Sequence, residues 1–201
     1  TGAGAYTSDA ASSLLMGRRV DAAAYYLTGS LGWQRISDTA RYTPGTNFVP
    51  PRTCPAADGN TVEQWLLNEG TGATATAVVT SPANDGTITN GTWEQQWHDE
   101  GTPVMLQSVV GGTGFYSTIT DAASIQNLAD NAFTAEGWFR ILKTGTNQYL
   151  FNKGVGTWTS GWRVWSRSDT GGIRAAVICA TTTALADTSI SLTDGLWHYI
   201  K

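Results

Sequence analysis

The acidic side chains set the first limit on the chemistry that this chain could perform. Glycoside hydrolysis needs two carboxyl groups placed on either side of the scissile bond, commonly from closely spaced positions on one strand. Glu136 has no such neighbour, because the nearest acids in the sequence are Asp130 and Asp169. We expect Glu136 to be an outward-facing strand residue that pairs with Arg140 or another neighbour.

The two histidines do not add a nucleophilic site. His98 stands in Trp-His-Asp-Glu, where a nearby serine or threonine is expected by chance in so Ser- and Thr-rich a chain, so no triad can be argued. His198 follows Trp197, and we expect it to pack or to form a hydrogen bond at a turn. The sequence therefore predicts no catalytic residue and a protein that is not an enzyme.

Aromatic residues are better candidates for contact with a ligand, because their faces pack against the C–H surfaces of sugars. Trp158 lies in the Gly- and Thr-rich stretch 154–161, where burial is difficult to arrange. It is the first candidate for ligand contact, followed by Tyr149 and Trp165. Packing of these rings on their own sheet is the alternative.

Aspartates and cysteines leave two further questions open. Calcium could bind the oxygen atoms of aspartates at turns, but turns favour aspartate for local hydrogen bonds as well. The aspartates at expected turns are Asp85, Asp121, Asp169 and Asp194. We name no metal ligand among them. Cys54 and Cys179 lack the paired spacing of a zinc site, and they form either one long-range disulfide or two free thiols.

Charge and hydropathy exclude some partners. The net charge is −4, the sequence pI is about 5.0, and Arg18-Arg19 is the single tight basic pair, so a duplex nucleic acid is not expected. No apolar run approaches the ~20 residues that span a bilayer, so no membrane insertion is expected. The chain begins at Thr1, which suggests a removed leader or earlier residues that are not represented.

Residues 1–60 differ in pattern from the rest of the chain. Leu15, Ala23 and Leu27 recur at helical spacing after Asp9, which predicts a short helix over residues 9–27. Prolines farther along the segment exclude both helix and central strand. We expect an N-terminal arm with a proline-rich linker, ordered by docking on its own domain or on a neighbouring subunit.

From residue 61 to 201, short branched and aromatic runs alternate with glycine turns. Phe133, Gly137 and Phe139 share one parity, while Glu136 and Trp138 share the other, so extended backbone sends them to opposite faces. Strands are expected at 62–67, 86–89, 103–107, 115–119, 133–141, 149–154, 161–166, 173–180, 190–192 and 196–200. This spacing predicts an all-β antiparallel β-sandwich of the jelly-roll type.

Five stretches come in the order found in one known family. They are Trp65-Leu-Leu-Asn-Glu-Gly-Thr-Gly, Asn84-Asp-Gly-Thr-Ile, Phe133-Thr-Ala-Glu-Gly-Trp-Phe, Leu150-Phe-Asn-Lys-Gly and Asp194-Gly-Leu-Trp-His. Residues 61–201 thus resemble the laminin-G-like jelly rolls of the concanavalin A-like lectin/glucanase superfamily. The resemblance implies structural roles for Trp65, Trp138 and Trp197. The stretch 103–112 departs from the family's Gly-x-Ala-Leu-x-Phe-x-Gly form, which puts a ligand or ion site near that corner in doubt.

The same resemblance implies a C-terminally incomplete sandwich, because the family continues for several strands past its Trp-His. We therefore expect a longer polypeptide or a neighbouring chain that supplies the missing strands. The implied function is a non-enzymatic surface module for adhesion that binds a carbohydrate or glycoprotein, extracellularly, on a cell or on a virion. The alternative is a structural virion decoration, fibre or filament subunit, which self-associates through residues 1–60.

Overall fold

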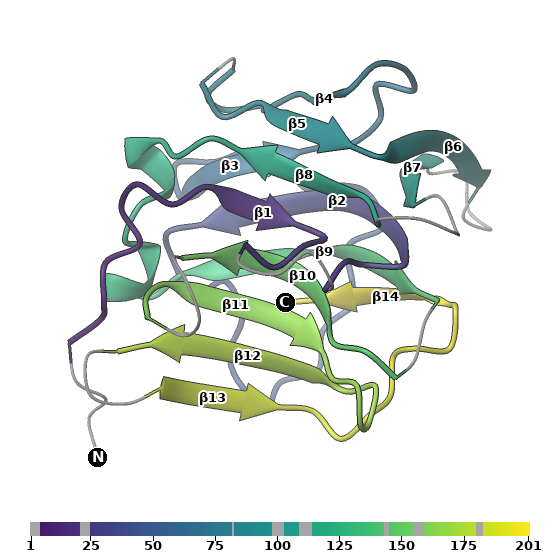
Figure 1. Ribbon diagram of the computed structural model, residues 1–201. Helices are drawn as coiled ribbons and strands as arrows, with labels where there is room; N and C mark the ends of the chain where they lie inside the picture. The colour runs from purple at the N-terminus through teal and green to yellow at the C-terminus, as the bar shows by residue number, and fades with distance from the viewer. Residues whose placement is uncertain are drawn as a thin grey trace.

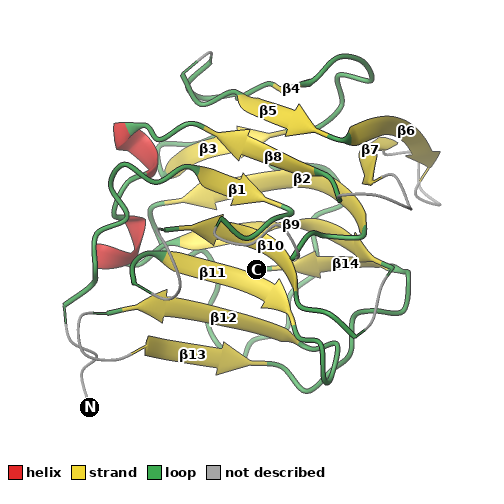
Figure 2. Cartoon of the chain, in the orientation of Figure 1, coloured by secondary structure: helices red, strands yellow, loops and turns green. Residues whose placement is uncertain are grey.

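The computed structural model is an antiparallel β-sandwich, as the alternation of strands and turns predicts. Its helical elements among the described residues are two short 3-10 turns, η1 (Ala123–Ile125) and η2 (Leu128–Asp130), drawn red in Figure 2. No described helix is long and apolar enough to cross a membrane. The structure describes residues 5–20, 25–81, 83–97, 103–108, 114–142, 145–154, 159–179 and 183–201, without the side chains of 94–97 and 103–108.

Two sheets make up the sandwich. The eight-stranded sheet has the order β13-β12-β11-β10-β1-β8-β5-β4. Its strands are β1 (Leu14–Met16), β4 (Thr74–Ala75), β5 (Gly86–Thr89), β8 (Tyr116–Ile119), β10 (Gln148–Lys153), β11 (Trp162–Ser166), β12 (Ile173–Ile178) and β13 (Thr183–Asp187). The six-stranded sheet has the order β14-β9-β2-β7-β6, with β3 also paired to β2. Its strands are β2 (Gly29–Ser37), β3 (Thr61–Trp65), β6 (Gly91–Trp97), β7 (Pro103–Ser108), β9 (Thr134–Ile141) and β14 (Trp197–Ile200).

The two sheets lie face to face, with the eight-stranded sheet in front in Figure 1. Side chains alternate along β9 as predicted, because Phe139 and Ile141 are fully buried in the core between the sheets, and Glu136 and Trp138 lie on the outer face. The ring of Phe139 meets that of Phe151 on β10 edge to face, with centroids 5.4 Å apart. This contact joins the two sheets at the centre of the core.

The helix predicted over residues 9–27 is wrong. This segment contains β1, which lies between β10 and β8 and pairs with a strand on each edge. Beyond β1, the Leu27 amide donates to the Gly17 carbonyl at 2.8 Å. All three residues of β1 are buried. Burial and pairing on both edges therefore outweigh the good helix propensity of its leucines and methionine.

The expected N-terminal arm also needs correction, because the described residues of 1–60 supply strands to both sheets. β1 is central in one sheet, and β2 in the other pairs with β9 on one side and with β7 and β3 on the other. Residues 38–60, which we call the strap, contain neither helix nor strand, in agreement with their prolines. The strap lies over the outer face of the six-stranded sheet, where Trp138 Nε1 donates to the Pro51 carbonyl at 2.9 Å.

The last part of the eight-stranded sheet differs from the predicted pattern. Residues 190–192 are not a strand, and the chain forms the edge strand β13 at Thr183–Asp187 instead. All five residues of β13 are exposed. Alanine and aspartate, which make up three of its five residues, are depleted in strands, so local sequence gives little indication of β13.

Candidate functional site

Glu136 is sealed within the protein, contrary to its expected exposure. Its carboxylate is fully buried and accepts a hydrogen bond from Arg35 Nε at 2.5 Å and another from the Tyr42 hydroxyl at 2.5 Å. The Tyr199 hydroxyl donates to the same carboxylate oxygen as Tyr42. The predicted partner, Arg140, donates instead to the Gly195 carbonyl at 2.8 Å. We call Arg35, Tyr42, Glu136 and Tyr199 the sealed cluster.

The sealed cluster is arranged to hold a charge and not to transfer a proton. Burial, with the hydrogen bond to Glu136, raises the pKa of both Tyr42 and Tyr199 above the ordinary value of 10.0. Both hydroxyls therefore remain donors at neutral pH, and the guanidinium of Arg35 neutralises the carboxylate. A substrate could reach Glu136 only after displacement of Tyr42 and the strap. This geometry gives Glu136 a structural role.

An ion pair between Arg41 and Asp58, which we call the anchor, joins the two ends of the strap. Arg41 donates to the two carboxylate oxygens of Asp58 at 2.6 and 2.9 Å, and these hydrogen bonds hold the pKa of Asp58 below its usual range. Cys54 lies in the strap as a free, half-buried thiol, and burial raises its pKa to about 12. Cys179 is also free, so no disulfide joins the two cysteines in this structure.

The predicted ligand-contact residues lie on the other outer face of the sandwich. Tyr149 and Trp165 stand opposite each other on β10 and β11, with ring centroids 5.6 Å apart and an interplanar angle of 12°. Both are nearly covered, at 1% and 3% exposed. Trp158, the first candidate from the sequence, lies outside the described residues. The structure thus brings two of the three candidates together, but under other side chains.

Arginines and further aromatic rings extend this stack across the eight-stranded sheet. The Arg19 guanidinium lies over the Tyr25 ring at 5.1 Å and over Tyr149 at 5.9 Å, and Arg174 lies 5.8 Å from the centroid of Trp165. We call the whole row the aromatic–arginine band. Its members, from β12 to β8, are Arg174, Trp165, Tyr149, Tyr25, Arg19, Arg18, Tyr26 and Tyr116.

Arg18 lies at the end of the band next to β8. Its guanidinium lies 4.7 Å from the ring centroid of Tyr116 and 5.4 Å from that of Tyr26. Cross-strand pairing with Tyr26 places it there, and Gly114 leaves space for the tyrosine, since a Cβ on Gly114 would lie 2.3 Å from that of Tyr26. All three members of this end are half-buried. Among the described residues Arg18 has no carboxylate partner, and its Nε has no hydrogen-bond acceptor.

Arg174 provides a contrast at the opposite end of the band. Its Nε and a terminal nitrogen each donate to a carboxylate oxygen of Asp187 at 2.6 Å, so its charge is already neutralised. From the sequence, the pair Arg18-Arg19 was used only as an argument against nucleic-acid binding. The position of these arginines beside aromatic rings was not predicted. The available signal was the pair Tyr25-Tyr26, which follows the arginines at the distance that a short hairpin brings together.

Several predicted local roles are confirmed. His198 Nε2 lies 2.7 Å from Asp194 Oδ1, and Asp85 accepts a hydrogen bond from the Ala77 amide at 2.8 Å, as expected for turn aspartates. Trp65 is fully buried and donates to the Asn84 carbonyl at 2.9 Å. In the part of the chain that the structure describes, no three His, Cys, Asp or Glu side chains gather as a metal site would require. Calcium binding stays a prediction.

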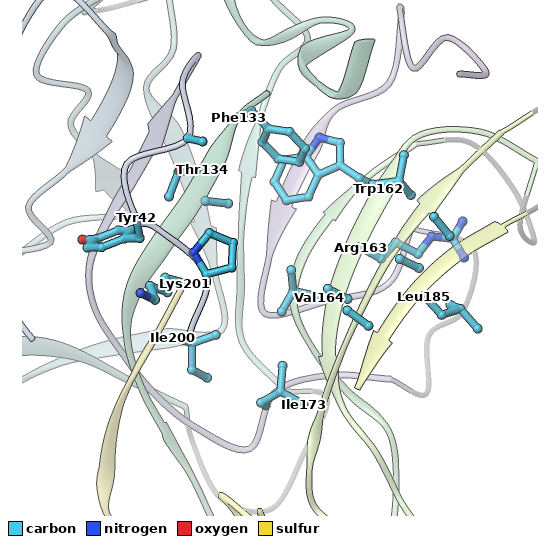
Figure 3. A pocket seen from close by; sticks show the side chains of 18 of the residues that line it. Tyr42, Phe133, Thr134, Trp162, Arg163, Val164, Ile173, Leu185, Ile200 and Lys201 are labelled. Carbon is cyan, nitrogen blue, oxygen red and sulfur yellow. The ribbon is translucent and has the colours of Figure 1, made fainter. Parts of the chain in front are cut away.

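A groove opens between the strap and the inner face of β11, β12 and β13. It encloses about 660 Å³ and is mostly apolar. In Figure 3, Tyr42, Ile200 and Lys201 stand on one side, and Val164 and Ile173 on the other. No aspartate or glutamate is among the described residues that line it. The groove is therefore a candidate binding site with no paired carboxylates for hydrolysis.

Comparison with known proteins returned no relative of this chain: no protein family, no curated protein and no solved structure matches it.

Proposed function

We propose that the protein is a non-enzymatic binding module for adhesion, and that the Arg18 end of its aromatic–arginine band takes an acidic saccharide of a glycan or glycoprotein. The observation that carries this proposal is Arg18, a half-buried arginine held between the rings of Tyr26 and Tyr116 without a carboxylate of its own. The resemblance to laminin-G-like jelly rolls agrees with such a role. It also favours an extracellular, cell-surface or virion-surface location.

The band offers the two kinds of contact that an acidic sugar needs. The tyrosine faces pack against the C–H surface of a pyranose ring, and the planar guanidinium donates two parallel hydrogen bonds to a carboxylate or sulfate. Tyr26 and Tyr116 fix the guanidinium before binding, with ring centroids 5.9 Å apart, which reduces the entropy lost when the ligand binds. The buried Tyr149–Trp165 stack would then support the binding residues from below.

The alternative of a structural subunit that assembles through residues 1–60 receives less support. Strands β1 and β2 occupy central positions in the sheets, so the described residues 14–16 and 29–37 are not available as a tether. An enzymatic function is also disfavoured, because the one carboxylate on the central strand β9 is sealed by Arg35, Tyr42 and Tyr199.

The proposal is tested by calorimetric titration with sialyllactose and with lactose, which differ by one carboxylated sugar. We expect the native protein to bind sialyllactose about tenfold more tightly than lactose, since one charge-assisted bidentate contact contributes roughly 1.4 kcal/mol. Arg18→Gln should remove this difference. A glycan array that carries uronic and sulfated sugars extends the same test to other anions.

Arg174→Gln is the matched control, because it removes an arginine from the same face that is already paired with Asp187. It should leave the preference for sialyllactose unchanged. Binding of neither acidic nor neutral saccharides, on the array or in titration, would refute the proposed function. An equal effect of the two substitutions would refute the assignment to Arg18.

A further inference from the structure

We propose that Lys153 and Asp121 condense into an isopeptide bond inside the folded protein, with Asp9 as the proton carrier. The bond would join the end of β10 to the segment that follows β8, and these are the two strands that flank β1. The inference does not depend on saccharide binding, because the three residues lie outside the aromatic–arginine band and the reaction involves no ligand.

Lys153 places an amine beside a carboxyl group in a site that is nearly closed to solvent. Its side chain is fully buried, with Nζ 2.7 Å from Asp121 Oδ1, and the side chain of Asp121 is 16% exposed. Lys153 follows Phe151 by two positions on β10, so alternation directs both side chains to the inner face. Burial is costly for both charges, and conversion of the two groups into one neutral amide removes that cost.

The other carboxylate oxygen of Asp121 is held by two donors. The Ala11 amide donates to Oδ2 at 2.9 Å, and Gln126 Nε2 donates to the same atom. When Nζ attacks the carboxyl carbon, negative charge remains on this oxygen, and fixed N–H donors stabilise it. Ala11 has a φ of 67°, a left-handed conformation that is unfavourable for a residue with a Cβ. The backbone is therefore strained at the residue whose amide points at Asp121.

Asp9 is placed to move protons between the reacting groups. Its carboxylate is fully buried, with Oδ1 4.0 Å from Lys153 Nζ. The Tyr6 hydroxyl donates to Oδ2 at 2.6 Å and the Asn127 amide to Oδ1 at 2.8 Å, so the carboxylate is fixed beside the amine. In Figure 1, the segment before β1 accordingly runs beside the two 3-10 turns.

The reaction needs no other reactant. One proton passes from the Lys153 ammonium to the Asp9 carboxylate, and the neutral amine attacks the carboxyl carbon of Asp121 to form a C–N bond. The bond from that carbon to Oδ1 then breaks, and Oδ1 leaves as water with the proton from Asp9 and a second proton from the nitrogen. Asp9 returns to its starting form. Oδ2 becomes the carbonyl of the new amide and keeps its two donors.

The bond would reinforce the centre of the eight-stranded sheet. β1 is only three residues long, and its Leu14 stands opposite Lys153 on one side and Ile119 on the other. Few main-chain hydrogen bonds therefore join the two halves of the sheet at this point. A covalent link between the flanking strands would also restrict the unfolded chain, as a disulfide does.

Mass spectrometry of the intact, denatured protein tests the proposal. The native protein should be lighter than the expressed sequence by one water molecule, and a digest should contain one fragment in which residues 121 and 153 are joined. Lys153→Arg keeps the positive charge but lacks the reactive amine, so it should have the full mass. Asp9→Asn keeps the reacting pair and should slow the loss of water by about 10²–10⁴-fold when protein purified in urea is refolded.

Asp130→Asn is the matched control for Asp9→Asn, because Asp130 belongs to the adjacent turn η2 and is exposed. It should lose water as fast as the native protein does. An equal delay in the two variants would overturn the role of Asp9.

Two results would overturn the isopeptide bond itself. One is a native protein that keeps its full mass after refolding and prolonged incubation. The other is a loss of water that persists in Lys153→Arg, because a cyclic imide at an Asp-Gly pair such as Asp194-Gly195 loses the same mass. The joined fragment from the native protein decides the question even if Lys153→Arg does not fold. Saccharide binding by a protein of full mass would refute this inference alone, and loss of water without saccharide binding would refute the proposed function alone.

Discussion

Both outer faces of the sandwich combine arginines with aromatic rings, but only the six-stranded sheet supplies a carboxylate at the centre of its cluster. There, Arg35 is bonded to Glu136 beneath the strap, and both side chains are at most 5% exposed. On the eight-stranded sheet, Arg18 lies between two tyrosines, is half-buried, and has no such acid among the described residues.

This difference agrees with a stabilising role for the outer face of the six-stranded sheet and with the binding role proposed for that of the eight-stranded sheet. A buried ion pair that its own chain completes has no capacity for an external anion, and removal of one partner leaves an uncompensated charge. An arginine that lies between two rings, with no carboxylate partner among the described residues, has that capacity, and its removal should cost the fold little stability. The two faces therefore make opposite predictions for the same substitution.

The largest expected difference is between the two arginines, each replaced by alanine. Arg35→Ala should lower the free energy of unfolding by about 3–5 kcal/mol, because it leaves the buried Glu136 carboxylate without its ion-pair partner. Arg18→Ala should lower it by only about 0.5–1 kcal/mol, the contribution of a partly exposed cation–π contact. Urea unfolding followed by tryptophan fluorescence measures both. Similar losses from the two substitutions would contradict the division between a structural and a binding face.

A smaller difference in stability between the two faces is expected when one tyrosine of each is replaced by phenylalanine. Tyr42→Phe removes a donor to the Glu136 carboxylate and should cost about 1.5–3 kcal/mol, as for hydrogen bonds to charged groups. Tyr26→Phe removes a hydroxyl that forms no hydrogen bond with the described residues, so its cost should be near zero. A loss from Tyr26→Phe as large as that from Tyr42→Phe would show that the band is also structural.

The tyrosines of the sealed cluster also predict how stability changes in alkali. Burial raises the pKa of Tyr42 and Tyr199 above 10.0, so the stability that they contribute is fully present below pH 10. Above that pH the unfolded chain loses its phenolic protons while the folded state retains them. The unfolded state then binds fewer protons, and stability falls as pH rises. This fall should be less steep in Tyr42→Phe than in the native protein when unfolding is measured between neutral pH and pH 11.

Local patterns in the sequence predicted the strands of the second part well. Phe139 and Glu136 were assigned to opposite faces of β9 correctly, because alternation is a property of the strand itself. β1 was read as helix, since three residues with good helix propensity carry no sign of the two strands that pair with them. Strand pairing over long distances decided that element.

The clusters on the outer faces could not be predicted from local sequence either, because they too depend on contacts between distant parts of the chain. Arg35 and Glu136 are 101 positions apart, and the strap that covers them is a stretch whose prolines indicate only the absence of regular structure. Tyr149 and Trp165 were recognised as candidates by residue type, but their burial depends on which segments lie above them. Residue type predicts what a side chain can contact, and topology decides whether a ligand can reach it.

The smallest expected effect concerns the strap, and Cys54 reports it. Asp58→Asn should weaken the anchor to Arg41, because the hydrogen bonds that lower the pKa of Asp58 require its charge. A strap that opens more often exposes Cys54, whose thiol then returns from a pKa of about 12 to its ordinary 9.0 and reacts faster. We expect alkylation of Cys54 to be about two- to fivefold faster at neutral pH, measured by mass spectrometry in a Cys179→Ser background.

A matched substitution on the other face completes this test of the strap. Asp187→Asn removes a similar exposed ion pair, with Arg174, at a position that does not hold the strap. It should leave the alkylation rate of Cys54 unchanged. Acid should act on the native anchor as Asp58→Asn does, because a carboxylate with a lowered pKa stabilises the folded state above its ordinary value of 3.8 and loses that contribution as pH falls below it. Equal rates in the native protein and Asp58→Asn would mean that the aromatic contacts of Tyr42 and Phe48 hold the strap without its anchor.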